Sequence, residues 1–124
     1  MKKYRVILLS SLAVVIFVGV AWAWTTICEQ FMDQYGVTCN DNEQVSANSN
    51  YRATLDMVHT QSGATVHCKV IKDGVSVKDF TLKTGSTSDE TYYFMFPTTG
   101  TYTLQSTNIS NPTNLDAMVH WQVE

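Results

Sequence analysis

Positive charge is scarce in this sequence. The 124 residues contain 8 Lys and Arg against 11 Asp and Glu, and three of the basic residues lie among the first five positions. Residues 24–124 are left with five basic and eleven acidic side chains, a net charge of −6. Nucleic-acid phosphates and anionic lipid surfaces are bound by clustered Lys and Arg. The composition therefore argues against a nucleic-acid partner and against a basic membrane-surface protein.

The motifs of metal sites and of nucleophilic catalysis are also missing. His59, His67 and His120 have no His-x-His or Cys-x-x-Cys neighbour, whereas metal ligands usually recur at a fixed spacing. No G-x-S-x-G is present, and Cys68 lies between valines, where a thiol is normally an inert small hydrophobe. The acidic run over residues 40–43 matches a calcium-binding loop poorly. We therefore expect no catalytic residues, no metal site and no cofactor.

One long hydrophobic run occurs, and it is N-terminal. Three basic residues precede an uncharged stretch over residues 6–23, which ends in an A-x-A site at Ala21 and Ala23. This pattern is typical of a secretory signal peptide, with cleavage between Ala23 and Trp24. An uncleaved membrane anchor is the alternative, because the 18 uncharged residues are at the lower limit of a bilayer-spanning helix. Under both interpretations the remaining domain is exported. We therefore expect a secreted or cell-envelope protein whose mature domain is not embedded in the membrane.

Three cysteines would reach an oxidising compartment, where disulfides form. Three thiols allow one bridge. We expect Cys28–Cys39, which closes a short loop worth roughly 2–3 kcal/mol in chain entropy. Cys39–Cys68 is the alternative. Because Cys68 alternates with Val66 and Val70, we expect its thiol to be buried and unpaired.

The first part of the exported chain favours a helix. Between residues 25 and 35, apolar side chains recur every four positions, at Ile27, Phe31 and Tyr35, which predicts a short amphipathic helix. The Asn- and Ser-rich segment that follows predicts a loop with a weak edge strand near Val45. The chain is thus divided into a signal peptide (1–23), a short helix with a polar loop (24–44) and a β domain (45–124).

In the rest of the chain, apolar and polar residues alternate in short segments separated by turn signals. The Asp73–Gly74 dipeptide between two such segments predicts a type I′ hairpin turn, because both central residues need positive φ. That turn fixes a register that would bring Asp79 inward, so we expect a β-bulge or strand end near Lys78–Asp79. Short strands with almost no helix predict an all-β fold, an antiparallel β-sandwich.

The stretch TTGTYTL resembles the tyrosine corner of immunoglobulin-like domains. In that motif a Tyr at the start of the sixth strand hydrogen-bonds back across the corner, two residues before a core position. These positions are Tyr102 and Leu104 here, and antibody domains carry a cysteine at the second of them. The sequence is therefore similar to exported microbial Ig-like and fibronectin-like sandwiches that lack the inter-sheet bridge. The resemblance implies an Ig-like antiparallel β-sandwich of about seven strands over residues 51–123, and it implies no activity.

Aromatic side chains gather in one strand. We expect Tyr92, Phe94 and Phe96 to face the core, because aromatic rings at alternate strand positions bury the largest area. Tyr93 and Met95 alternate with them and are the candidates for a surface patch that binds a sugar or a protein.

Together these patterns predict an exported, non-enzymatic binding module at the cell surface or in the envelope, whose partner is a protein or a carbohydrate. A small secreted inhibitor or toxin-like effector that inserts a loop into its target is the alternative. A small hydrolase ranks third, because no catalytic constellation accompanies the fold.

We predict that intact-mass measurement of the exported protein gives the mass of residues 24–124 alone, because the A-x-A site follows a bounded hydrophobic region. A mass that includes residues 1–23 would contradict cleavage and would identify the N-terminal segment as an anchor.

Overall fold

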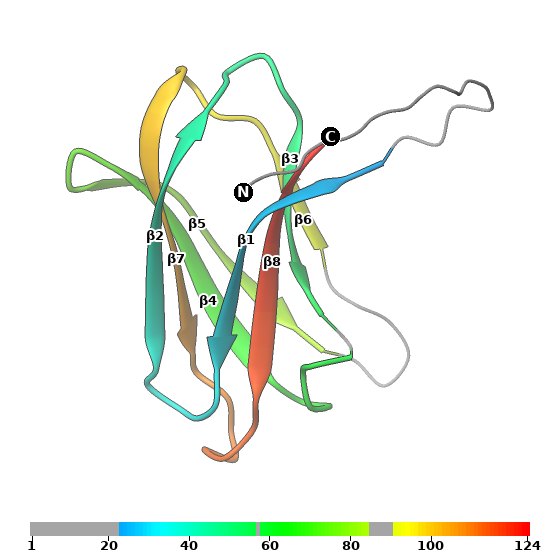
Figure 1. Ribbon diagram of the computed structural model, residues 1–124. Coiled ribbons are helices and arrows are strands. Elements are labelled where there is room, and N and C mark those ends of the chain that lie inside the picture. Colours follow the sequence, from blue (N-terminus) through cyan, green and yellow to red (C-terminus); the bar gives the residue numbers. More distant parts are fainter. Residues whose placement is uncertain (1–22, 57, 85–90) are drawn as a thin grey trace.

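Two four-stranded antiparallel sheets make up the part of the chain that the structure, a computed structural model, describes: residues 23–56, 58–84 and 91–124 (Figure 1). The first sheet has the strand order β1-β8-β3-β6 and the second has the order β2-β7-β4-β5. The predicted signal peptide lies outside the described residues except for its last residue. The strands are β1 (Thr25–Met32), β2 (Thr38–Val45), β3 (Tyr51–Leu55), β4 (Thr65–Lys72), β5 (Val75–Lys83), β6 (Thr91–Phe94), β7 (Gly100–Asn108) and β8 (Ala117–Val123).

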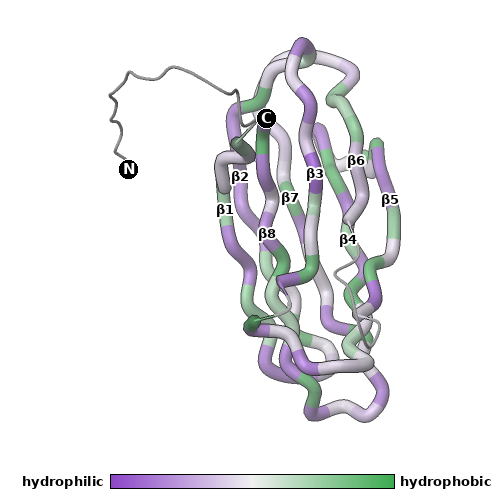
Figure 2. The backbone as a smooth tube through the Cα atoms, turned by 90° about the vertical axis from the view of Figure 1, so that its right-hand side faces the viewer, coloured by the Kyte–Doolittle hydropathy of each residue, from purple (hydrophilic) through white to green (hydrophobic). Residues whose placement is uncertain are grey.

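The two sheets enclose one core of buried apolar side chains. Hydrophobic and hydrophilic residues alternate along most of the strands (Figure 2), and in β4 the side chains of Val66, Cys68 and Val70 are fully buried. The predicted all-β sandwich is therefore confirmed, with eight strands among the described residues rather than about seven. None of these residues forms a helix that could cross a membrane.

The predicted N-terminal helix is wrong. Residues 25–32 form strand β1, which pairs with β8 along its length. A spacing of four residues places side chains on one face of a strand as well as on one face of a helix, so that pattern did not discriminate between the two. The buried residues of β1 are Gln30 and Met32. Because one of them is polar, no hydrophobic alternation marks the strand.

The segment predicted as a polar loop with a weak edge strand near Val45 is an edge strand from Thr38 to Val45. β2 pairs with β7 along its whole length. Outward side chains hydrogen-bond across this pair: Thr103 donates to Asn42 at 2.7 Å and Thr101 donates to Gln44 at 2.8 Å. Such cross-strand pairs stabilise a sheet. The acidic run over residues 40–43 thus lies in a strand, where successive side chains point to opposite faces and do not converge as calcium ligands do.

The hairpin between β4 and β5 has the predicted turn. Asp73 and Gly74 have φ angles of 52° and 78°, as a type I′ turn requires. The register then slips by one residue, because Ser76 and Lys78 pair with adjacent residues of β4 and Val77 between them has no cross-strand partner. The predicted β-bulge is confirmed next to its expected position, and it leaves Asp79 exposed.

The buried amide of Gln30 connects the two sheets. The side chain of Gln30 is 1% exposed. Its Nε2 donates to the carbonyl oxygen of Leu104 at 2.8 Å and to the carboxylate of Asp41 at 3.0 Å. Its Oε1 accepts from the Trp121 indole at 2.8 Å and from the Ser106 hydroxyl. Gln30 and Trp121 belong to the first sheet and the other partners belong to the second, so one side chain joins both layers.

The tyrosine corner has the geometry that the sequence motif predicts. Tyr102 is 1% exposed, and its hydroxyl donates to the carbonyl oxygen of Thr98 at 3.0 Å. The same hydroxyl oxygen accepts from the Thr98 backbone amide at 3.3 Å. The corner thereby ties the start of β7 to the segment before it.

The strand order departs from that of an immunoglobulin domain. In those domains the strand with the tyrosine corner and the strand after it share a sheet. Here β7 carries the corner in the second sheet, whereas β8 lies between β1 and β3 in the first. The architecture that the structure establishes is therefore an antiparallel β-sandwich, and the corner is the feature it has in common with Ig-like domains.

We predict that Tyr102→Phe lowers the free energy of unfolding by about 0.5–1.5 kcal/mol, because the hydrogen bonds between the Tyr102 hydroxyl and the backbone of Thr98 are lost while the ring stays packed. Tyr93→Phe should change it by less than about 0.5 kcal/mol, because this side chain is 62% exposed. Urea unfolding of both variants measures the difference. Equal small effects would contradict a stabilising corner.

Candidate functional site

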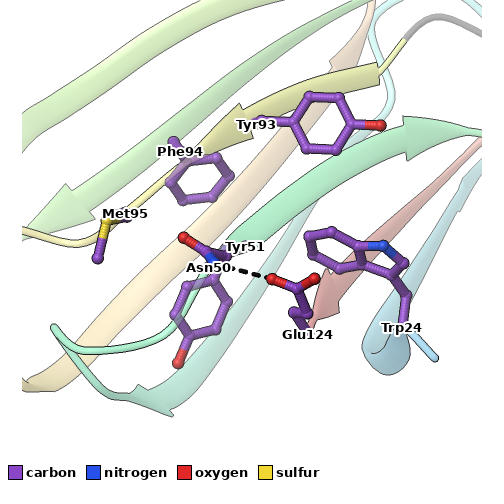
Figure 3. Close-up of a pocket in the computed structure, with 7 residues that line it drawn as sticks. All are labelled: Trp24, Asn50, Tyr51, Tyr93, Phe94, Met95 and Glu124. Carbon is purple, nitrogen blue, oxygen red and sulfur yellow. Dashed lines mark hydrogen bonds between the residues drawn. The ribbon is translucent and has the colours of Figure 1, made fainter. Parts of the chain in front are cut away.

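A pocket of about 400 Å³ lies where β3 begins, β6 ends and β8 ends (Figure 3). Its volume falls within the range of about 300–1,000 Å³ that is usual for small-ligand sites. Its lining comes from four separate stretches of the chain: Trp24, Asn50, Tyr51, Tyr93, Phe94, Met95 and Glu124.

Two aromatic rings form the exposed wall of the pocket. The ring centres of Trp24 and Tyr93 are 5.9 Å apart and the ring planes are inclined at 58°. Arg52 is paired with Tyr93 across β3 and β6, and its guanidinium carbon lies 4.4 Å from the centre of the Trp24 ring. The Arg52 Nε also donates to the side chain of Gln122 at 2.6 Å. The hydrogen bond to Gln122 holds the Arg52 guanidinium in place. The cation–π contact with this guanidinium therefore positions the Trp24 indole.

Buried rings form the floor. Tyr51 and Phe94 are 5% and 8% exposed, and their ring centres are 6.2 Å apart in a stacked arrangement. The Tyr51 hydroxyl accepts from the backbone amide of Ser46 at 2.9 Å. Because these rings belong to the packed core, the floor is formed without a ligand.

The polar part of the pocket is an amide hydrogen-bonded to a carboxylate. Asn50 Nδ2 donates to Glu124 Oε1 at 2.8 Å, and the Glu124 backbone amide donates to the Asn50 carbonyl oxygen at 3.0 Å. Within the described part of the chain, Asn50 Oδ1 and Glu124 Oε2 have no hydrogen-bond partner. The amide and the carboxylate can therefore both still bind a ligand beside the aromatic wall.

The structure brings the two predicted patch residues to this pocket. Tyr93 and Met95 are 62% and 49% exposed, and both line it. Sequence reasoning missed Trp24, Asn50 and Glu124. The one available signal was the aromatic side chain of Trp24 at the first position of the predicted mature chain.

The predicted disulfide is not formed. Cys28, Cys39 and Cys68 all carry free thiols, which also rules out the alternative Cys39–Cys68 bridge in this structure. The Cys39 thiol donates instead to the carbonyl oxygen of Phe31 at 3.4 Å. Burial, followed by the negative charge of Asp41, raises the pKa of Cys28 and of Cys39. Cys68 is fully buried, as its alternation with valines predicts, and burial raises its pKa to about 12.

The three histidines each lie beside a carboxylate. His59 and His120 contact the carboxylate of Asp56 at 2.8 and 3.0 Å, and His67 pairs with Asp79. Partial burial acts to raise the pKa of Asp56, but the hydrogen bond with His59, a backbone amide and the nearby His120 together lower it below its usual value. Among the described residues, no three His, Cys, Asp or Glu side chains are grouped as metal ligands.

Comparison with models of known protein families and with curated protein sequences gives no match.

We predict that the thiols react slowly with iodoacetamide near pH 8, because thiolate is the reactive form and burial raises each pKa. Asp41→Asn should speed the modification of Cys28 and Cys39, by up to about tenfold for each pKa unit that it restores. Cys68, whose pKa Asp41 does not influence, is the internal control. Peptide mapping by mass spectrometry reads all three rates, and a Cys28–Cys39 cross-linked peptide under non-reducing conditions would contradict the free thiols.

Proposed function

We propose that this protein is an exported, non-enzymatic binding module that takes its ligand in the pocket that Trp24 and Tyr93 line. The observation that carries the proposal is the exposed aromatic wall beside the Asn50–Glu124 pair. Apolar walls with a few convergent polar groups are the usual composition of a ligand site. The core-packed floor keeps the pocket open in advance, so binding costs little ordering of the protein.

The lining of the pocket favours binding over catalysis. Glu124 is the one carboxylate among the residues that line it, whereas glycoside hydrolysis by the usual route needs two carboxylates on opposite sides of the bond. The aromatic rings and the Asn50 amide supply contact area and hydrogen bonds but no nucleophile. These groups can hold a ligand without changing it.

The proposed location and family likeness rest on separate features. Export is supported by the basic, hydrophobic and A-x-A pattern of residues 1–23. The likeness to exported Ig-like modules is supported by the Tyr102 corner. A module of this kind would present the pocket, which lies at one end of the sandwich, to the cell surface or to the medium.

We predict that residues 24–124 sediment with washed cell envelopes of the producing organism, and that Tyr93→Ala reduces the bound fraction about tenfold or more. Loss of a central aromatic contact typically has an effect of this size. Tyr35→Ala is the matched control, because Tyr35 is 56% exposed and lies in the turn between β1 and β2, at the other end of the sandwich (Figure 1).

Both variants should keep the wild-type urea midpoint, because each replaces an exposed ring. Equal sedimentation of the wild type and of Tyr93→Ala would show that the pocket does not bind the envelope, and this outcome would overturn the proposal.

A further inference from the structure

Opposite charges flank the aromatic wall of the pocket. The Arg52 guanidinium lies against the Trp24 ring, and the Glu124 carboxylate lines the pocket itself. A cationic ligand on the indole would face the guanidinium across the ring, while an anionic ligand would face Glu124. Residues 24–124 also carry a net charge of −6, which repels anions further. Arg52 on the indole thus acts against a cationic ligand at the aromatic wall, while Glu124 and the net charge act against an anionic one.

The polar groups fit hydroxyls. A hydroxyl group donates one hydrogen bond and accepts others. Two neighbouring hydroxyls can thus donate to Glu124 Oε2 and accept the second amide hydrogen of Asn50, since the first already binds Glu124 Oε1. A purely apolar ligand would remove both groups from water without replacing their hydrogen bonds, which is costly.

The aromatic wall fits the apolar face of a sugar ring. The carbon-bound hydrogens of a pyranose form one face of the ring, and they pack on an aromatic plane while the hydroxyls project from the rim. Trp24 and Tyr93 offer two such planes whose centres are 5.9 Å apart. The exposure of Tyr93 leaves this side of the wall accessible to a ligand that is itself largely hydrated.

We infer that the ligand of this pocket is an uncharged carbohydrate. Sugar rings pack on Trp24 and Tyr93, whose planes are inclined at 58°, and adjacent hydroxyls bind the Asn50–Glu124 pair. The inference rests on the proposed function, and it specifies the chemical class of the ligand.

Tryptophan fluorescence tests this inference directly. Residues 24–124 contain two tryptophans, Trp24 and Trp121, and Trp121 is 1% exposed. A ligand-dependent change in emission therefore reports on Trp24, and Trp24→Phe should abolish it. The probes are tetrasaccharides of glucose, mannose, galactose and N-acetylglucosamine, with tetramethylammonium and a tetragalacturonate as the cationic and anionic probes.

At least one uncharged tetrasaccharide should bind saturably, with a Kd that changes by less than about twofold between about 0.05 and 0.5 M NaCl, because salt screens only charged ligands. Tyr93→Ala should raise this Kd about tenfold or more. Glu124→Gln should raise it about tenfold, because a charge-assisted hydrogen bond becomes a neutral one. Tyr35→Ala should leave it unchanged.

The outcomes separate the ligand class from the proposed function. Tighter, salt-sensitive binding of tetramethylammonium or tetragalacturonate would overturn the carbohydrate inference and leave the binding module in place. Envelope retention that depends on Tyr93, with no response to any of the uncharged saccharides, would also overturn the carbohydrate inference and leave the binding module in place. It would indicate a protein partner. Loss of both the saccharide response and the Tyr93-dependent retention would overturn both.

Discussion

The hydrogen bonds of the Gln30 side chain are the constraint on which the arrangement of the two sheets depends. A buried amide must use its donors and its acceptor, because the interior offers no water to replace them. Gln30 does so with groups of both layers: the Leu104 carbonyl and the Ser106 hydroxyl in the second sheet, and the Trp121 indole in the first. These partners are satisfied together only at one separation and one register of the sheets. The amide therefore selects a packing that apolar contacts alone would leave less specific.

The position of β1 in turn sets the geometry of the pocket. β1 is an edge strand of the first sheet, held to β8 by its backbone and to the second sheet by Gln30. Its register pairs Thr25 with Val123, so the next residues outward, Trp24 and Glu124, meet at the same end of the sheet. The pairing of β3 with β6 brings Tyr93 to that end as well. The pocket is thus a product of strand register, and its residues are far apart in the sequence.

The parts of the fold that could be predicted from sequence are those in which apolar residues mark the buried face. The alternation in β4 and the Asp73–Gly74 turn identified a hairpin. The register of that turn would have placed the Asp79 carboxylate in the core, and this conflict predicted the bulge close to its actual position. β1 and β2 were missed because their inward positions hold Gln30 and acidic residues, whose partners lie on strands far along the chain. The same limit applies to the site. Alternation alone identified Tyr93 and Met95 as outward residues, whereas Trp24, Asn50 and Glu124 join them only through strand pairing.

The acidic residues on the inward side of β2 have a consequence for association between copies of the chain. Asp41 and Glu43 are half-buried near the edge of the second sheet, and burial followed by the charge of Asp41 raises the pKa of Glu43. A foreign strand that paired with β2 would enclose these carboxylates further and deprive them of solvent. Inward charges of this kind protect the exposed edge of a sheet against strand addition. The chain thus carries its own safeguard against fibril-like aggregation along this edge.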